Sequence, residues 1–143
     1  MNNNKDFAVF AIIEKIDKGI PLVMERGYFP SGEKWKLPGG RPVKINDSKR
    51  EALKRKVFRK IKIVVIPGEV IFKKAIFKEK RVGHNFIVLR ADYSYGDPIA
   101  IKHEIKKVKL CSRAEIENMI EKGEILGNHA TALKKFFKSY GSL

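Results

Sequence analysis

The sequence predicts one α/β domain that spans residues 1–143. Three observations support this prediction. Apolar runs of strand length are interspersed with a few helical segments in mixed order, which is typical of a sheet covered by helices. The chain has 143 residues, 43% of them hydrophobic, which is enough for one hydrophobic core. No internal repeat, low-complexity segment or linker divides the sequence.

The first half of the chain is expected to contain two strands, an extended segment and a helix. Residues 6–16 are predicted as a strand, and their consecutive apolar positions indicate that both faces are buried. Residues 20–25 are predicted as a second strand that pairs with it across the turn "DKG". The short extended segment "WKL" leads into a Pro-Gly-Gly sequence at 38–40, which favours a tight turn. A helix is predicted over residues 48–61.

The second half is expected to alternate strands and helices. Residues 63–78 are predicted as two strands that are broken at Pro67 and Gly68, because this dipeptide favours a turn. A basic turn, "KEKRVGH", separates them from the next strand. The remaining predicted elements are a strand at 85–94, a strand at 104–111, a helix at 112–124 capped by Ser112, and a last helix at 129–140.

No segment of the sequence has the pattern of a secretion signal or a membrane span. The first residues, "MNNNKDF", are polar and run directly into a strand. The longest apolar run, "FAVFAII", is far shorter than a membrane-spanning helix. The single cysteine, Cys111, excludes an internal disulfide and fits a reducing compartment. We therefore expect a cytoplasmic protein without a membrane partner.

The charge of the chain is strongly positive. There are 31 lysine and arginine residues against 16 aspartate and glutamate residues, which gives a formal net charge of +15. Such a surface attracts polyanions, including nucleic acids and nucleotide polyphosphates. Composition alone does not distinguish a functional partner from a generally basic surface.

The helix predicted at 48–61 has an unusual basic face. Ser48 and Glu51 have the spacing of a capping box, so a structural role is the preferred interpretation of Glu51. Apolar residues at helical spacing form the face that is expected to be buried. Several of the remaining residues are like-charge pairs four positions apart, and each pair destabilises a helix by about 0.2–0.5 kcal/mol. A bound polyanion would relieve this repulsion, whereas a simple solvated face would usually be mixed in sign.

The segment "WKLPGG", followed by a loop and the helix "REALKRKVFRKIKI", resembles the Nudix hydrolase (MutT-like) domain. Ala52, Arg55 and Val57 fall at the alanine, arginine and apolar positions of the Nudix box. The resemblance covers nearly the whole chain and implies an α/β/α sandwich with a mixed β-sheet. In that family the glycine turn is structural, and here it consists of Pro38, Gly39 and Gly40.

The sequence departs from the family at the residues that would bind metal. The resemblance places the family's three metal-binding glutamates on Lys56, Arg59 and Lys60, and the box glycine on Lys62. The upstream glutamate falls at 46–47, on an asparagine or an aspartate. Magnesium needs several oxygen ligands, and cationic side chains repel it. We therefore expect no cofactor, with magnesium or manganese required only if hydrolysis is retained.

The preferred hypothesis is a Nudix-fold protein without metal-dependent pyrophosphohydrolase activity that binds RNA or a nucleotide polyphosphate. Guanidinium and ammonium groups would contact phosphate directly, and aromatic side chains would stack on bases. The candidate phosphate-binding residues are Arg41, Lys49, Arg55, Lys56, Arg59 and Lys60, and the candidate aromatic residues are Tyr28, Phe29 and Trp35.

Two alternatives remain open from the sequence. The first is a hydrolase of nucleoside diphosphate-linked compounds that recruits acids from outside the box, with Glu104, Asp47 and Glu51 as candidates. The second is a non-catalytic interaction module of a larger assembly. The resemblance also permits a homodimer.

Overall fold

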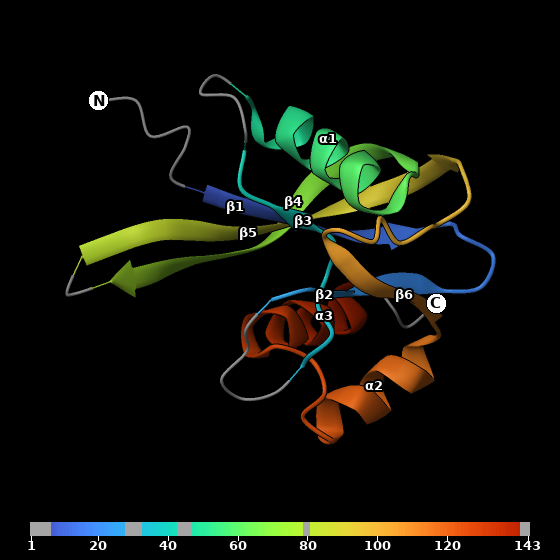
Figure 1. Cartoon of the computed structure of the whole chain (residues 1–143). Coiled ribbons are helices and arrows are strands. Elements are labelled where there is room, and N and C mark those ends of the chain that lie inside the picture. The colour runs from blue at the N-terminus through green and yellow to red at the C-terminus, as the bar shows by residue number, and fades with distance from the viewer. Residues whose placement is uncertain (1–6, 28–32, 43–46, 79–80, 141–143) are drawn as a thin grey trace.

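The structure is a computed structural model that describes residues 7–27, 33–42, 47–78 and 81–140. Figure 1 shows the arrangement of the helices and strands along this chain. In chain order they are β1 (Phe7–Glu14), β2 (Ile20–Glu25), β3 (Gly39–Gly40), α1 (Lys49–Ile61), β4 (Val64–Lys78), β5 (Arg81–Tyr95), β6 (Ile105–Cys111), α2 (Arg113–Glu121) and α3 (Gly127–Tyr140).

The strands form a mixed sheet between helices, which confirms the predicted α/β class. The larger sheet has the strand order β3-β1-β5-β4, and a second sheet pairs β2 with β6. The predicted pairing of β2 with β1 is therefore wrong, because β1 pairs with β3 and β5 instead. β1 runs parallel to β5, whereas the other pairings are antiparallel. In Figure 1, α1 lies above the sheet and α3 lies below it, with α2 beside α3. The arrangement is the α/β/α sandwich with a mixed sheet that the sequence predicts.

Strand β1 is buried on both faces, as its uninterrupted apolar sequence predicts. Successive strand residues point to opposite faces. Ala8, Phe10 and Ile12 accordingly belong to the core cluster that includes α2 and α3 residues. The residues between them belong to the cluster that packs on α1. β1 therefore contributes side chains to the hydrophobic layers on both faces of the sheet.

The glycines at 39 and 40 form strand β3, so the predicted tight turn is wrong. They pair antiparallel with Val9 and Phe10 of β1. The carbonyl of Pro38 also accepts a hydrogen bond from the Ala11 amide at 3.0 Å. A Cβ built on Gly39 would lie 2.1 Å from the Val9 carbonyl oxygen, and the φ of Gly39 is +146°. Glycine is required here because the chain approaches β1 too closely for any side chain.

The region predicted as two strands is one long strand, β4. The pairing of β4 with β5 shifts register between Pro67 and Val70 instead of ending there. An edge strand tolerates proline and bulges because one side of it needs no ladder hydrogen bonds. β5 likewise begins at Arg81, within the segment predicted as a basic turn. β4 and β5 extend together beyond the body of the protein (Figure 1).

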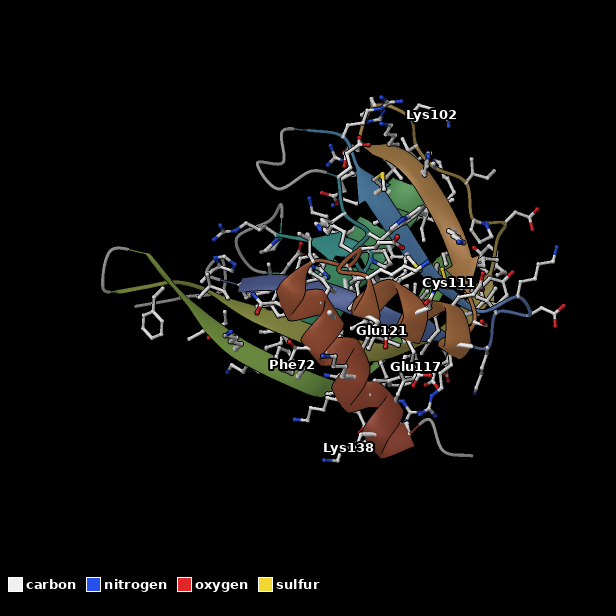
Figure 2. The ribbon with its side chains drawn as sticks, turned by 90° about the horizontal axis from the view of Figure 1, so that it is seen from below. Phe72, Lys102, Cys111, Glu117, Glu121 and Lys138 are labelled. Atoms are coloured by element: carbon white, nitrogen blue, oxygen red, sulfur yellow. The ribbon has the colours of Figure 1, made fainter. Side chains whose placement is uncertain are left out.

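The helix starts agree with the capping residues in the sequence. Ser48 is the N-cap of α1, and its hydroxyl accepts from the Glu51 amide at 3.1 Å. The complete reciprocal capping box forms at α2, between Ser112 and Glu115. α3 begins two residues earlier than predicted, at Gly127, and it lies over one face of the sheet (Figure 2). Its buried apolar residues belong to the core cluster that includes Phe10 and Ile12 of β1. No helix in the described part of the chain is long and apolar enough to cross a membrane.

The C-cap residue of α1, Lys62, has a left-handed backbone conformation. Its φ is +62° and its ψ is +24°, and its amide donates to the Phe58 carbonyl. Helices commonly end in this way on a glycine, because a side chain is disfavoured in the left-handed region by about 1–2 kcal/mol. The position matches the box glycine of the Nudix pattern. The backbone conformation is thus present although the glycine is not.

We predict that Lys62→Gly stabilises the fold by about 1 kcal/mol, because glycine removes the left-handed strain. Urea unfolding followed by circular dichroism measures this change. Lys54→Gly is the matched control, since Lys54 is exposed in the interior of the same helix. This substitution should destabilise the fold by about 1 kcal/mol. An equal loss of stability in both variants would contradict the assignment of strain to Lys62.

A basic cluster as the candidate functional site

The ammonium group of Lys60 is buried at the centre of the site. Lys60 lies in the last turn of α1, and only 8% of its surface is exposed. Its Nζ donates to Glu25 Oε2 and to the Gly39 carbonyl oxygen, at 2.5 Å each. The interaction joins α1 to the end of β2 and to β3. A lysine in the interior requires such partners because desolvating a charge is costly.

A second lysine shares the same carboxylate. Lys36 Nζ lies 3.2 Å from Glu25 Oε2, with only 11% of the Lys36 side chain exposed. Burial opposes ionisation of Glu25, but Lys36 and Lys60 outweigh burial and lower its pKa. Burial also lowers the pKa of Lys36, although Glu25 partly opposes this change. One carboxylate therefore serves two ammonium groups.

Lys56 and Arg59 extend this arrangement along α1. Lys56 Cδ and Cε would lie 3.5 and 3.7 Å from a Cβ built on Gly40, so Lys56 covers β3 beside Lys60. Burial lowers the pKa of Lys56, and the neighbouring charges of Lys60 and Arg59 lower it further. Arg59 Nε is 3.0 Å from Glu104 Oε1. We call this group of residues the basic cluster: Lys36, Lys56, Arg59 and Lys60, with the carboxylates of Glu25 and Glu104.

The basic cluster carries more positive than negative charge. Its four cations face two carboxylates, which leaves a formal charge of +2. At an effective dielectric constant of about 20, two unit charges 4 Å apart interact by about 4 kcal/mol. A bound anion would therefore relieve repulsion that the protein itself leaves uncompensated.

An aromatic pocket lies on the α3 side of the sheet. It has a volume of about 350 Å³, and Phe10, Phe86, His129 and Asn128 are among its lining residues. Lys36 Nζ lies 4.8 Å from the centre of the Phe10 ring, which joins the pocket to the cluster. The histidine ring makes edge contacts with both phenylalanine rings.

His129 is a neutral structural element of this pocket. Its Nδ1 accepts a hydrogen bond from the Leu37 amide at 3.1 Å. Burial lowers its pKa well below the ordinary value, and the charges of Lys36 and Lys60 act in the same direction. The neutral ring fixes the chain next to Lys36 without adding a further charge.

The other candidate residues from the sequence have separate surroundings. Arg55 is paired with the buried Asp47, so both are engaged outside the basic cluster. Arg41 is exposed and lies near His84, which lines the aromatic pocket. Burial of His84 lowers the pKa of this histidine, and the charge of Arg41 lowers it further. Lys49 and Glu51 are exposed in the first turn of α1. Trp35 is half-buried, and Tyr28 and Phe29 lie outside the described residues.

Sequence reasoning missed Lys36, Glu25 and His129. Each lies in a segment whose sequence is typical of ordinary structure. The bridge between Val23 and Lys36 and the hydrogen bond from the Leu37 amide to His129 bring them together. A weak signal existed for Glu25, which is the charged end of the otherwise apolar strand β2. Lys36 offered another, because it is a charge between Trp35 and the fully buried Leu37.

The donor set does not fit magnesium or manganese. Lysine and arginine occupy the positions where the resemblance places metal-binding glutamates. The carboxylates nearest to them are in ion pairs, with Glu25 on Lys60, Glu104 on Arg59 and Asp47 on Arg55. Within the described residues, no group of three or more His, Cys, Asp or Glu side chains could hold a metal ion. A divalent cation would have to displace ammonium and guanidinium groups from these oxygens.

Comparison with known proteins identifies the fold. No protein-family model matches the sequence, and no curated protein matches it. Solved structures do match over nearly the whole chain. The E. coli ORF135 protein has 22% identity and a TM-score of 0.70, with 95% of this chain and 91% of that chain covered. The MutT protein from Methanosarcina mazei Go1 has 21% identity and a TM-score of 0.69, with 93% of each chain covered.

A Nudix hydrolase from Nitrosomonas europaea is similar as well. It has 18% identity and a TM-score of 0.72, with 94% of this chain and 89% of that chain covered. The chain therefore has the Nudix fold, as its resemblance to that family implies. Because these identities are low, the similarity establishes the fold alone.

Glu25→Gln tests the shared carboxylate. We expect the free energy of unfolding to fall by about 3 kcal/mol near neutral pH, because two ammonium groups lose their anion. Since the fold lowers the pKa of Glu25 below 4.5, its contribution is present above that pH. The contribution is lost as the pH falls through the lower, folded-state pKa. Urea unfolding as a function of pH measures both effects.

Two further variants control this experiment. Lys60→Met combined with Glu25→Gln should recover much of the lost stability, because an apolar side chain replaces one unpaired ammonium group. Glu121→Gln, on the exposed face of α2, should change stability by less than about 0.5 kcal/mol. If Glu25→Gln unfolds at the same urea concentration as the wild type, the carboxylate does not hold the site together.

Proposed function

We propose that this protein binds phosphate-rich ligands, a nucleotide polyphosphate or RNA, at the basic cluster, without metal-dependent hydrolysis. One observation carries the proposal. The Lys60 ammonium group is buried against Glu25 and the Gly39 carbonyl, where the Nudix pattern has a metal-binding glutamate. The positive charge that a metal ion supplies in such a site would here belong to the protein.

Direct phosphate binding follows from the charges of the cluster. Lys56 is only partly buried, and its pKa is lowered by burial and by two cationic neighbours. A phosphate dianion at Lys56 would favour the charged amine and screen it from Arg59 and Lys60. Charge-assisted hydrogen bonds of this kind are about twice as strong as neutral ones.

The aromatic pocket supports a nucleotide as the ligand. Phosphate bound at Lys56 and Lys36 would leave the rest of the molecule beside Phe10. A base would contact the apolar wall of this pocket, together with the amide of Asn128 for hydrogen bonding. Pockets that combine apolar walls with a few polar groups are typical of small-molecule sites.

Hydrolysis would need carboxylates that are not held in ion pairs with lysine or arginine. Glu104 and Asp47 would each have to leave an arginine partner before either could bind a metal ion or activate water. Glu51 is exposed at the N-terminal turn of α1, about two and a half helical turns from Lys60. The proposal therefore favours binding over bond cleavage.

The proposal predicts that ATP binds in the presence of EDTA, and that Lys56→Met weakens this binding about 10-fold, which corresponds to about 1.4 kcal/mol. Isothermal titration calorimetry measures the affinity. Lys54→Met is the matched control, because this exposed lysine lies two residues away and therefore points to a different side of the helix. It should change the affinity less than about 2-fold.

Chromatographic separation of substrates from product nucleotides decides between binding and hydrolysis. We expect no release of AMP or ADP from ATP, ADP-ribose or diadenosine polyphosphates, with or without magnesium. Release that requires magnesium and disappears in Glu104→Gln would overturn the non-catalytic assignment. Absence of ATP binding in EDTA would overturn the proposed phosphate site itself.

A further inference from the structure

A second basic surface lies along β6, outside the basic cluster. It is a groove of about 510 Å³ that combines one large aromatic side chain with several lysines. None of these lysines belongs to the basic cluster or to α1. The lining residues are Trp35, Ile99, Ala100, Lys102, Lys106, Lys107, Val108 and Lys109.

Strand register places Trp35 and Lys107 on one face of the sheet formed by β2 and β6. Val23 of β2 is bridged to Lys36, so the preceding residue, Trp35, lies beside Met24. Met24 is in turn the pairing partner of Lys107 on β6. Residues directly opposite each other in paired strands project from the same face. Trp35, Met24 and Lys107 thus form one row across three chain segments.

Two of the four groove lysines form ion pairs with carboxylates. Lys106 is 2.6 Å from Glu33, and Lys109 is 3.9 Å from Glu115. Within the residues that the structure describes, neither Lys102 nor Lys107 has a carboxylate oxygen at ion-pair distance, and both are exposed. The groove therefore keeps an excess of positive charge next to a half-buried indole.

The groove borders the end of α1, which carries the basic cluster. Ile105 of β6 pairs with Glu25, the shared carboxylate of the cluster. The Ile101 amide donates to the Lys60 carbonyl at 3.1 Å, which places the segment before β6 against the end of α1. Lys109 lies four residues beyond Ile105, or about 13 Å along an extended strand. A ligand that reaches both sites must be longer than one nucleotide.

We propose that the basic cluster and the β6 groove form one binding track for single-stranded nucleic acid. This inference rests on the proposed function and specifies its ligand class. Trp35 offers a surface on which a base can stack, and Lys102 and Lys107 contact phosphates beyond those held at the cluster. Proteins that bind single strands combine stacking aromatics with a basic groove in this way, with sites of about 4–16 nucleotides.

The single tryptophan of the chain provides a direct test. Trp35 fluorescence should be quenched by an eight-nucleotide oligouridylate, and by oligothymidylate of equal length if the 2′-hydroxyl is not required. ATP in EDTA, which would occupy only the basic cluster, should leave the fluorescence unchanged. Quenching by neither oligonucleotide would overturn the proposed contact with Trp35.

Charge reversal tests the lysines of the groove. Lys102→Glu combined with Lys107→Glu should weaken oligouridylate binding about 10-fold relative to ATP binding, measured by fluorescence anisotropy and calorimetry. The salt dependence should flatten by about 0.7 in the log–log slope for each phosphate contact that is lost. Lys135→Glu combined with Lys138→Glu is the control with the same change of charge. Figure 2 shows Lys138 on α3, far from Lys102.

The outcomes separate this inference from the proposed function. If the groove variant and the control weaken oligouridylate binding equally, the effect comes from net charge alone, and the proposed track is overturned. Tight ATP binding with no gain in affinity from one to eight nucleotides would also overturn the track, while the phosphate site at the cluster would stand. Binding of neither ATP nor oligonucleotides would overturn both proposals.

Discussion

The buried ammonium group of Lys60 is the interaction on which the site depends. It holds α1 against the end of β2 and against the glycine strand β3, through Glu25 and the Gly39 carbonyl. This geometry requires a chain without a Cβ at position 39, because β3 lies directly against β1. The Gly-Gly segment of the Nudix pattern thus has a second role here, since the buried carbonyl of Gly39 is the acceptor for a lysine.

The charge of the site follows from this arrangement. Glu25 satisfies Lys60 and Lys36 together, so one negative charge is shared between two positive charges. Lys56 and Arg59 add to the positive side, and Glu104 neutralises only one of them. In a metal-dependent site the carboxylates form the surface and the cation arrives from solution. Here the cations are lysine and arginine side chains of the protein, and we infer that an anion binds to them from solution.

The sequence was sufficient for most of the architecture, because local signals agreed with the fold. The apolar pattern of β1 predicted burial on both faces, and Ser48 predicted the start of α1. The pairing of β3 and the length of β4 were not predictable, because Pro-Gly and Gly-Gly also favour turns when their tertiary partners are unknown. The basic residues of α1 were visible in the sequence. Their separation into an inward lysine, Lys60, and an outward arginine, Arg55, depends on carboxylates from distant segments.

A crystal structure of the protein grown with ATP and manganese tests the central claim most directly, because manganese is located by its anomalous scattering. The account predicts phosphate oxygens within hydrogen-bonding distance of Lys56 Nζ, an intact contact between Lys60 and Glu25, and no anomalous peak on α1. A manganese ion held on α1 by Glu25 or Glu104, with Lys60 turned away from the Gly39 carbonyl, would contradict it.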